Sequence, residues 1–195
     1  MLQEPAYSQP VVSAPRILVI GDSLSAEYGL RRHSGWVELL NATLSKLPTP
    51  VTVINASISG DTTSGGLTRI DAALISHQPT IVILELGAND ALRGLPLTLT
   101  QKNIKDMILR SQTAGAKVVL VGMQIPPNYG REYAQDFKNL FSTAAAQTGA
   151  ALVPFLFEGF ADQRQYFQTD GIHPNESAQP LILVTIRQAL DPLLR

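Results

Sequence analysis

The sequence contains no cysteine, which excludes disulfide bonds, thiolate catalysis and cysteine-ligated metals. It also lacks an excess of either charge: 15 lysines and arginines face 16 aspartates and glutamates, for a formal net charge of -1 at pH 7. This balance provides neither a basic field for nucleic acid nor a polybasic surface for anionic lipid. We therefore expect no nucleic-acid partner, and a small or uncharged ligand.

Long apolar runs are missing as well. No stretch reaches the ~18 apolar residues of a membrane-spanning helix, so we expect no integral membrane segment. The start, MLQEPAYSQPVVSAP, lacks the charged-then-apolar order of a signal peptide and is rich in proline, serine and glutamine. It predicts a flexible amino-terminal arm over residues 1–15, followed by one domain over 16–195. Either the protein is cytoplasmic or a leader has been removed.

The sequence does contain short β-branched runs that alternate with segments of helical spacing. The runs predict strands at 16–20, 51–55, 80–86, 117–122 and 151–155. The segments between and after them predict helices near 35–47, 63–77, 99–114, 132–148 and 175–194. Strict alternation of this kind predicts a three-layer α/β/α sandwich around a five-stranded parallel sheet. Because the runs are almost continuously apolar, we expect strands that are buried on both faces.

Glycines and small polar residues follow the predicted strands. The segments are GDSLS (21–25), ASISGD (56–61), GAND (87–90) and MQIPPNYG (123–130), and DGIHP (170–174) precedes the last helix. Ligands of open parallel sheets bind beyond the carboxyl ends of the strands. The sequence therefore predicts that its chemistry lies at this rim of the sheet.

Ser23 directly follows an apolar strand, in a turn that can lift its hydroxyl to the rim. A serine nucleophile needs a base, and that base needs an acceptor on its far nitrogen. His173 fits because Asp170 stands three residues before it, whereas His33 and His77 lie in segments typical of surface histidines. Two other interpretations stay open: a helix cap at the GDS turn, and a metal site or simple turn formed by Asp170 and His173.

Acyl transfer also needs hydrogen-bond donors for a developing oxyanion. The backbone N–H groups of Ser23 and Gly60 and the side-chain amide of Asn89 are the candidates, since each lies just after a predicted strand. Taken singly, Gly60 also fits a turn glycine and Asn89 a helix cap. Their occurrence after successive strands favours a shared site.

These segments resemble the signature segments of the SGNH hydrolases, also called GDSL lipases and esterases. GDSLS carries Ser23, ISGD carries Gly60, GAND carries Asn89, and DGIHP carries Asp170 and His173. The wider segments NASISGDT, LELGANDALRG, IPPNYGREY and DGIHPN are similar to bacterial multifunctional thioesterase I/lysophospholipase L1 and related arylesterases. The resemblance implies a flavodoxin-like fold and hydrolysis of fatty acyl thioesters, aryl esters or lysophospholipids through an acyl-enzyme, with no metal and no organic cofactor.

The resemblance also carries expectations about where and how the protein acts. Members of the family often have an export signal and act in the periplasm. We therefore expect a periplasmic or secreted protein whose leader has been removed, with a cytoplasmic location still open. We further expect a monomer whose partner is a small acyl ester or thioester substrate.

Apolar residues in the rim loops are candidates for binding an acyl chain, with core packing as the alternative for each of them. They are Leu92, Leu95, Leu97, Ile125, Pro126, Tyr129 and Ile172. The nearby cluster of Phe155, Leu156, Phe157 and Phe160 is expected to be mainly core with partial exposure.

Two glutamates need separate interpretations. Glu85 lies within an apolar strand, where we expect a structural role in accepting hydrogen bonds from backbone N–H groups or polar neighbours beneath the site. Glu27 stands where relatives generally have a small residue. We expect its carboxylate near the entrance of the site, where it would disfavour anionic substrates such as acyl-CoA.

Two alternatives to an acyl ester or thioester hydrolase stay open. A carbohydrate O-deacetylase would use the same catalytic residues, but it would need aromatic platforms for sugar rings, and the single tryptophan, Trp36, is expected in the core. A non-catalytic flavodoxin-like binding protein would explain the fold alone. GDSLSAEYG, however, lacks the glycine pattern of a phosphate-binding turn.

Overall fold

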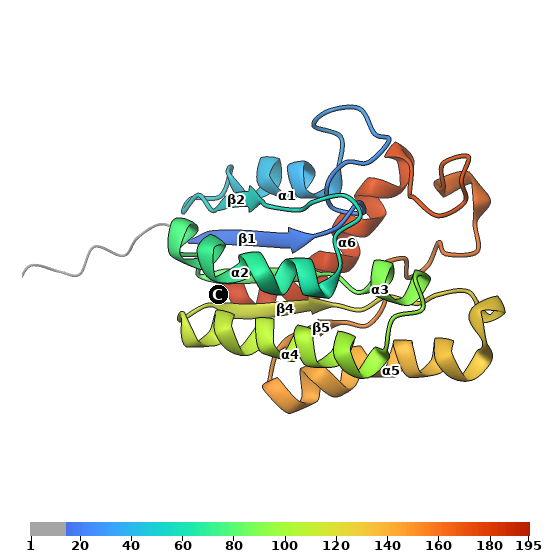
Figure 1. Cartoon of the computed structure of the whole chain (residues 1–195). Coiled ribbons are helices and arrows are strands. Elements are labelled where there is room, and N and C mark those ends of the chain that lie inside the picture. Colours follow the sequence, from blue (N-terminus) through green and yellow to red (C-terminus); the bar gives the residue numbers. More distant parts are fainter. Residues whose placement is uncertain (1–14) are drawn as a thin grey trace, which may run out of the picture.

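Five strands form one parallel sheet in the order β2-β1-β3-β4-β5 in the computed structural model, which describes residues 15–195 (Figure 1). The strands are β1 (Arg16–Gly21), β2 (Thr52–Asn55), β3 (Ile81–Glu85), β4 (Lys117–Val121) and β5 (Ala151–Val153). Every neighbouring pair is parallel, and Ile17 of β1 lies opposite Val53 on one side and Ile81 on the other. The fold class predicted from the sequence is therefore confirmed. Residues 1–14 of the predicted amino-terminal arm lie outside the described residues.

Helices cover both faces of the sheet (Figure 1). They are α1 (Trp36–Leu44), α2 (Thr63–His77), α3 (Ala88–Leu92), α4 (Leu97–Thr113), α5 (Arg131–Thr148) and α6 (Gln179–Leu190), with short 3-10 turns η1 (Pro127–Tyr129), η2 (Arg164–Tyr166), η3 (Glu176–Ala178) and η4 (Asp191–Leu194). Side chains alternate along β1, so Ile17 and Val19 pack with α1 and α6, whereas Leu18 and Ile20 pack with α2, α4 and α5. Within residues 15–195, no helix is long and apolar enough to cross a membrane.

The edge strands differ from the sequence prediction. Burial on both faces is correct for the central strands, but in β2 the side chains of Thr52 and Asn55 are exposed and those between them are half-buried. An edge strand has a neighbouring strand on one side only, which leaves it less covered. β5 ends at Val153, two residues earlier than predicted, because Pro154 has no N–H to continue a strand ladder.

The helices differ in two places. The GAND segment, predicted as a loop, begins the short helix α3, which sits between β3 and α4. The predicted last helix, 175–194, is divided into η3, α6 and η4, and prolines stand in the first turns of α6 and η4. Proline suits a first turn because the backbone N–H it lacks has no partner there.

Candidate active site

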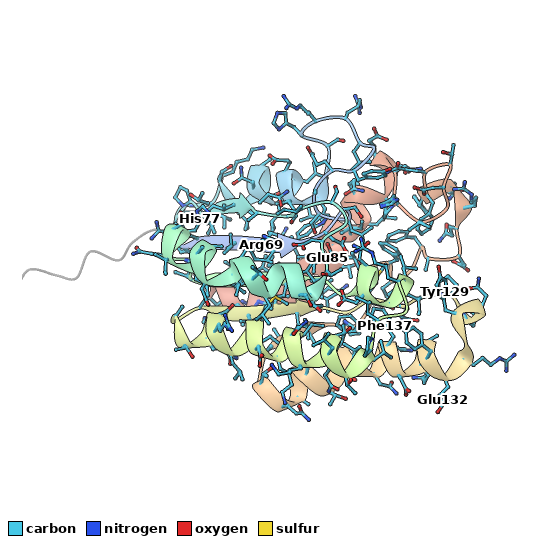
Figure 2. The ribbon with its side chains drawn as sticks, viewed as in Figure 1. Arg69, His77, Glu85, Tyr129, Glu132 and Phe137 are labelled. Atoms are coloured by element: carbon cyan, nitrogen blue, oxygen red, sulfur yellow. The ribbon has the colours of Figure 1, made fainter. Side chains whose placement is uncertain are left out.

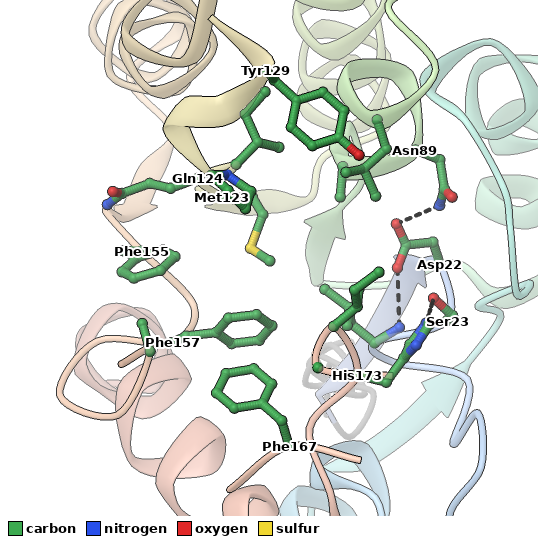
Figure 3. Close-up of a pocket in the computed structure, with 18 residues that line it drawn as sticks. Asp22, Ser23, Asn89, Met123, Gln124, Tyr129, Phe155, Phe157, Phe167 and His173 are labelled. Atoms are coloured by element: carbon green, nitrogen blue, oxygen red, sulfur yellow. Dashed lines mark hydrogen bonds between the residues drawn. The ribbon is translucent and has the colours of Figure 1, made fainter. Parts of the chain in front are cut away.

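A hydroxyl, an imidazole and a carboxylate form a continuous hydrogen-bonded chain at the carboxyl ends of the strands. Figure 3 shows the first two of these groups, on Ser23 and His173. The Oγ atom of Ser23, two residues beyond β1, lies 2.9 Å from Nε2 of His173. Nδ1 of the same imidazole lies 2.7 Å from Oδ2 of Asp170. The structure thus brings together the three residues predicted as nucleophile, base and orienting acid. Because both ring nitrogens are engaged, this arrangement does not fit the alternative in which His173 and Asp170 bind a metal.

Asp170 is fixed by its own loop. Its Oδ1 accepts the backbone N–H groups of Ile172 at 2.9 Å and of His173 at 3.0 Å. Partial burial alone would raise the pKa of Asp170, but these two hydrogen bonds and the His173 ring outweigh it and lower the pKa to about 2. The carboxylate is therefore ionised at neutral pH and holds the proton of the imidazole on Nδ1.

The other two histidines lie apart from this chain, as the sequence predicts. His33 is on the loop before α1 with its side chain 80% exposed. His77 is the last residue of α2, at the opposite end of the molecule from Tyr129 (Figure 2). Neither residue lines the cavity beside Ser23.

The turn that carries Ser23, the predicted nucleophile, contacts the buried side chain of Glu85, the last residue of β3 (labelled in Figure 2). The Asp22 N–H donates to Oε2 of Glu85 at 3.3 Å, and the Ser25 hydroxyl donates to the same oxygen at 2.7 Å. A Cβ on Gly21 would come within 2.9 Å of that oxygen, so only glycine fits at this point of the GDS motif. Burial, followed by the charge of Asp22, raises the pKa of Glu85 well above its usual range. The structural role predicted for Glu85 is confirmed by these contacts.

Asp22 is a buried carboxylate that the sequence analysis did not single out, since an aspartate in such a turn is usually a helix cap. It is 1% exposed, and its two oxygens accept the Leu24 N–H at 3.0 Å and the Asn89 side-chain amide at 2.9 Å. Burial raises the pKa of Asp22 to about 6, although both hydrogen bonds and the charge of His173 oppose the shift. The motif therefore places a poorly solvated carboxyl directly beside Ser23, the predicted nucleophile.

The three predicted oxyanion donors are not equivalent. The backbone N–H groups of Ser23 and Gly60 donate no hydrogen bond to any residue of the described chain, so both are available to a ligand. Gly60 has a φ of 79°, which favours glycine. The Asn89 amide nitrogen, in contrast, donates to Asp22 and, at 3.0 Å, to the carbonyl of Asp61. An oxyanion would share this amide with Asp22.

Buried and partly buried polar contacts join the loops that carry these donors. Arg69 of α2 donates to Oδ2 of Asp61 at 2.8 Å and to the carbonyl of Ala56 at 2.5 Å. Asp90, which follows Asn89, accepts the Thr63 N–H at 2.9 Å and its hydroxyl at 2.5 Å. These contacts fasten the loops after β2 and β3 to α2. No sequence motif identified this network.

A largely apolar cavity of about 500 Å³ opens beside Ser23 and His173. It runs past Met123 towards Phe155, with Phe157 and Phe167 along one side (Figure 3). Five of the predicted acyl-binding residues line it: Leu92, Ile125, Pro126, Tyr129 and Ile172. Residues not predicted to bind substrate also line it, among them Leu24, Met123, Phe155, Phe157 and Phe167.

Leu95 and Leu97 do not line this cavity, contrary to the prediction. Leu97 begins α4 and packs against the core beneath α2, α4 and α5. The backbone of Leu95 is engaged at both ends: its N–H donates to the Asp90 carbonyl at 2.9 Å and its carbonyl accepts the Tyr133 hydroxyl at 3.0 Å. Spacing alone did not distinguish the side of the loop that faces the cavity.

Glu27 also differs from the prediction. Its carboxylate accepts the backbone N–H groups of Gly35 at 2.7 Å and of His33 at 3.1 Å, and it does not line the cavity. The side chain therefore stabilises the loop before α1, and backbone N–H groups hydrogen-bond its carboxylate. Trp36 is fully buried, as expected, and its ring N–H donates to the Leu24 carbonyl at 3.2 Å.

A three-layer α/β fold with a serine, histidine and aspartate chain at its strand ends is the architecture of a serine hydrolase. Residues 19–179 match the GDSL-like lipase/acylhydrolase family. Esterase TesA of Pseudomonas aeruginosa is 45% identical over 182 residues, which cover 93% of this chain and 90% of the relative. Thioesterase 1/protease 1/lysophospholipase L1 of Escherichia coli is 39% identical over 182 residues, which cover 93% of this chain and 86% of that relative.

The fold agrees with these similarities. A crystal structure of TesA matches with a TM-score of 0.88 and 45% identity, covering 91% of this chain and 99% of that chain. The chain therefore belongs to the GDSL-like lipase/acylhydrolase family. The resemblance seen in its motifs is confirmed, and the protein is a serine acyl hydrolase.

Proposed function

We propose that this enzyme hydrolyses carboxylic esters and thioesters through an acyl-enzyme formed on Ser23. The observation that carries the proposal is the chain from Ser23 Oγ through His173 to Asp170, at 2.9 and 2.7 Å, at the mouth of an apolar cavity. The names of the relatives, an esterase and a thioesterase and lysophospholipase, support this reaction class.

In the first half of the reaction, His173 takes the proton of Ser23 as Oγ attacks the acyl carbonyl. The negative charge of Asp170 stabilises the imidazolium that forms. The carbonyl oxygen becomes an oxyanion, which the free N–H groups of Ser23 and Gly60 are available to bind, with the Asn89 amide as the shared third donor.

Collapse of this intermediate breaks the bond to the alcohol or thiol, which leaves with the proton held on His173. Water then enters, loses a proton to His173 and attacks the acyl-enzyme. The acid is released and Oγ of Ser23 regains its proton. Asp170, with its lowered pKa, remains ionised through both halves.

The shape and lining of the cavity favour substrates with an apolar acyl chain. Met123, Phe157 and Phe167 offer apolar surface immediately beyond the reacting atoms (Figure 3). We therefore propose fatty acyl thioesters, aryl esters and lysophospholipids as the substrate class. An O-deacetylase would leave most of this cavity empty, because an acetyl group is small. A pure binding protein would have no need for the aligned serine, histidine and aspartate.

The test is a hydrolysis profile of p-nitrophenyl esters of increasing chain length, acyl-CoA thioesters and an acetylated sugar. We expect wild-type activity on the acyl substrates and a loss of roughly 10⁴-fold or more in Ser23→Ala, because the nucleophile and its base act as a unit. Ser142→Ala, at an exposed serine of α5, is the matched control and should retain full activity. Activity retained by Ser23→Ala, or confined to the acetylated sugar, would contradict the proposal.

We also propose, from the family resemblance, that the enzyme acts as a monomer outside the cytoplasm. Light scattering on purified protein would report the mass in solution. Fractionation of cells that produce the protein would report its compartment. A stable dimer or a strictly cytoplasmic enzyme would contradict these expectations.

A further inference from the structure

The ring of Tyr28 lies against the imidazole of His173. The two ring centroids are 4.5 Å apart and the planes are tilted by 38°. Tyr28 comes from the loop after β1, a few residues beyond Ser23, so the nucleophile and this ring belong to the same segment. The tyrosine is 50% exposed, which shows that its ring covers the histidine without being part of the core.

Gln168 holds the two loops together. Its Nε2 donates to the Tyr28 carbonyl at 2.8 Å and to the Pro174 carbonyl at 3.1 Å. Its backbone N–H donates to the His173 carbonyl at 2.8 Å. A single side chain therefore joins the loop that carries Ser23 to the loop that carries the imidazole.

The contacts of Tyr28 separate it from the substrate-binding residues. It is not among the residues that line the cavity, and its hydroxyl makes no hydrogen bond within residues 15–195. What it provides at His173 is the face of an aromatic ring. Such a face restricts how far an imidazole can tip, and aromatic pairs have preferred geometries.

We propose that Tyr28 is a positioning residue for acyl transfer, which keeps the His173 imidazole in line between Ser23 and Asp170, and that Gln168 acts by holding Tyr28 in place. The inference rests on the proposed function, because it concerns the same proton transfer. It goes further by assigning a task to two residues outside the serine, histidine and aspartate chain. Alignment of reacting groups matters greatly for rate, since a displacement of ~1 Å can cost ~10²-fold.

The test compares two substitutions of Tyr28 under steady-state conditions. Tyr28→Leu should lower kcat about tenfold with KM within about twofold, because alignment is lost while the acyl cavity is intact. Tyr28→Phe keeps the ring and should stay within about twofold of wild type, because the hydroxyl has no hydrogen-bond partner within residues 15–195. Tyr129→Leu, which removes a ring that lines the cavity, should instead raise KM for long acyl chains.

A second readout isolates the reactivity of Ser23. The rate constant of inactivation by a short aryl methylphosphonate, which has no acyl chain, should fall in Tyr28→Leu by the same factor as kcat. Gln168→Leu should cause a smaller fall, and the double variant should be no slower than Tyr28→Leu alone, because Gln168 acts through Tyr28. If Tyr28→Leu fails to fold, Gln168→Leu and the phosphonate rate still test the proposal.

Three results would overturn the inference: kcat of Tyr28→Leu within twofold of wild type, a loss confined to KM, or an equal loss in Tyr28→Phe. If the double variant reacted more slowly than Tyr28→Leu by the full factor seen in Gln168→Leu, Gln168 would not act through Tyr28. These outcomes differ from failure of the proposed function, which would appear as hydrolysis by Ser23→Ala or as no acyl hydrolysis by wild type.

Discussion

Two carboxylates flank the reacting groups, and their surroundings are opposite. Asp22 is 1% exposed, and burial raises its pKa to about 6. Asp170 has a side chain that is 38% exposed, and hydrogen bonds from its own loop lower its pKa to about 2 against the effect of partial burial. The environment thus gives the same chemical group two different tasks. Asp170 is a fixed negative charge, whereas Asp22 is a poorly solvated hydrogen-bond acceptor.

The comparison extends to the two halves of the site. The buried half is the turn around Ser23. It is anchored to the core, because Glu85 accepts the Asp22 N–H and Trp36 donates to the Leu24 carbonyl. The exposed half is the surface loop with Asp170 and His173, which is shaped by local hydrogen bonds to the Asp170 carboxylate. We therefore expect changes in the buried half to lower stability, and changes in the exposed half to lower activity with little effect on stability.

The largest effect is expected in the exposed half. Asp170→Asn should lower kcat by roughly 10³–10⁴-fold, because the amide does not hold the imidazole in the required tautomer. Its remaining oxygen can still accept the N–H groups of Ile172 and His173, so the loop should keep its shape. Ester hydrolysis and urea unfolding at pH 7 test this together. A large loss of stability, or a rate loss below tenfold, would contradict the contrast between the halves.

The next effect concerns stability in the buried half. Glu85→Leu should lower the free energy of unfolding by about 3 kcal/mol, because the Asp22 N–H and the Ser25 hydroxyl lose their buried acceptor. Glu85→Gln keeps an acceptor oxygen and resembles the protonated carboxyl that the raised pKa favours, so it should cost less than ~1 kcal/mol. Urea unfolding at pH 7 measures both. Equal losses in the two variants would show that the charge of Glu85 is required.

Much of this site could be predicted from the sequence because its parts are local. GDSLS, GAND and DGIHP each lie in one short segment, and the carboxyl ends of parallel strands bring such segments to one rim. The sheet and most helices could also be predicted, because the alternation of apolar runs with segments of helical spacing is a local pattern. The edge strand β2 was harder to predict, because apolar character does not reveal how many neighbours a strand has.

The rest depends on contacts between distant segments. Phe167 reaches the cavity from a loop that no motif identified, Met123 does so from a rim segment in which only its neighbours were predicted to bind substrate, and Phe157 is both buried and part of the lining. The direction of the Glu27 carboxylate depends on the path of the loop that follows it. The hydrogen bond from the Asn89 amide to Asp22 could be predicted only if the positions of both loops were known. Spacing along the chain contains none of this information.

The smallest effect is a pair of opposite pH dependences of stability. Asp22 has a folded-state pKa of about 6 against an ordinary value of 3.8, so between these pH values the folded protein holds a proton that the unfolded chain has released. The free energy of unfolding therefore falls as pH rises through this window. Asp170 has a folded-state pKa of about 2 against an ordinary value of 3.8. Its contribution to the free energy of unfolding is therefore fully present above about pH 4, and it is lost as the pH falls towards 2.

Urea unfolding of wild type, Asp22→Asn and Asp170→Asn at a series of pH values separates the two. The stability of wild type relative to Asp22→Asn should fall, by on the order of 2 kcal/mol, between about pH 4 and 6. The stability of wild type relative to Asp170→Asn should rise between about pH 2 and 4, by less, because water screens the exposed carboxylate. Slopes of the same sign would mean that the two carboxylates share one environment, and the contrast between buried and exposed halves would not hold.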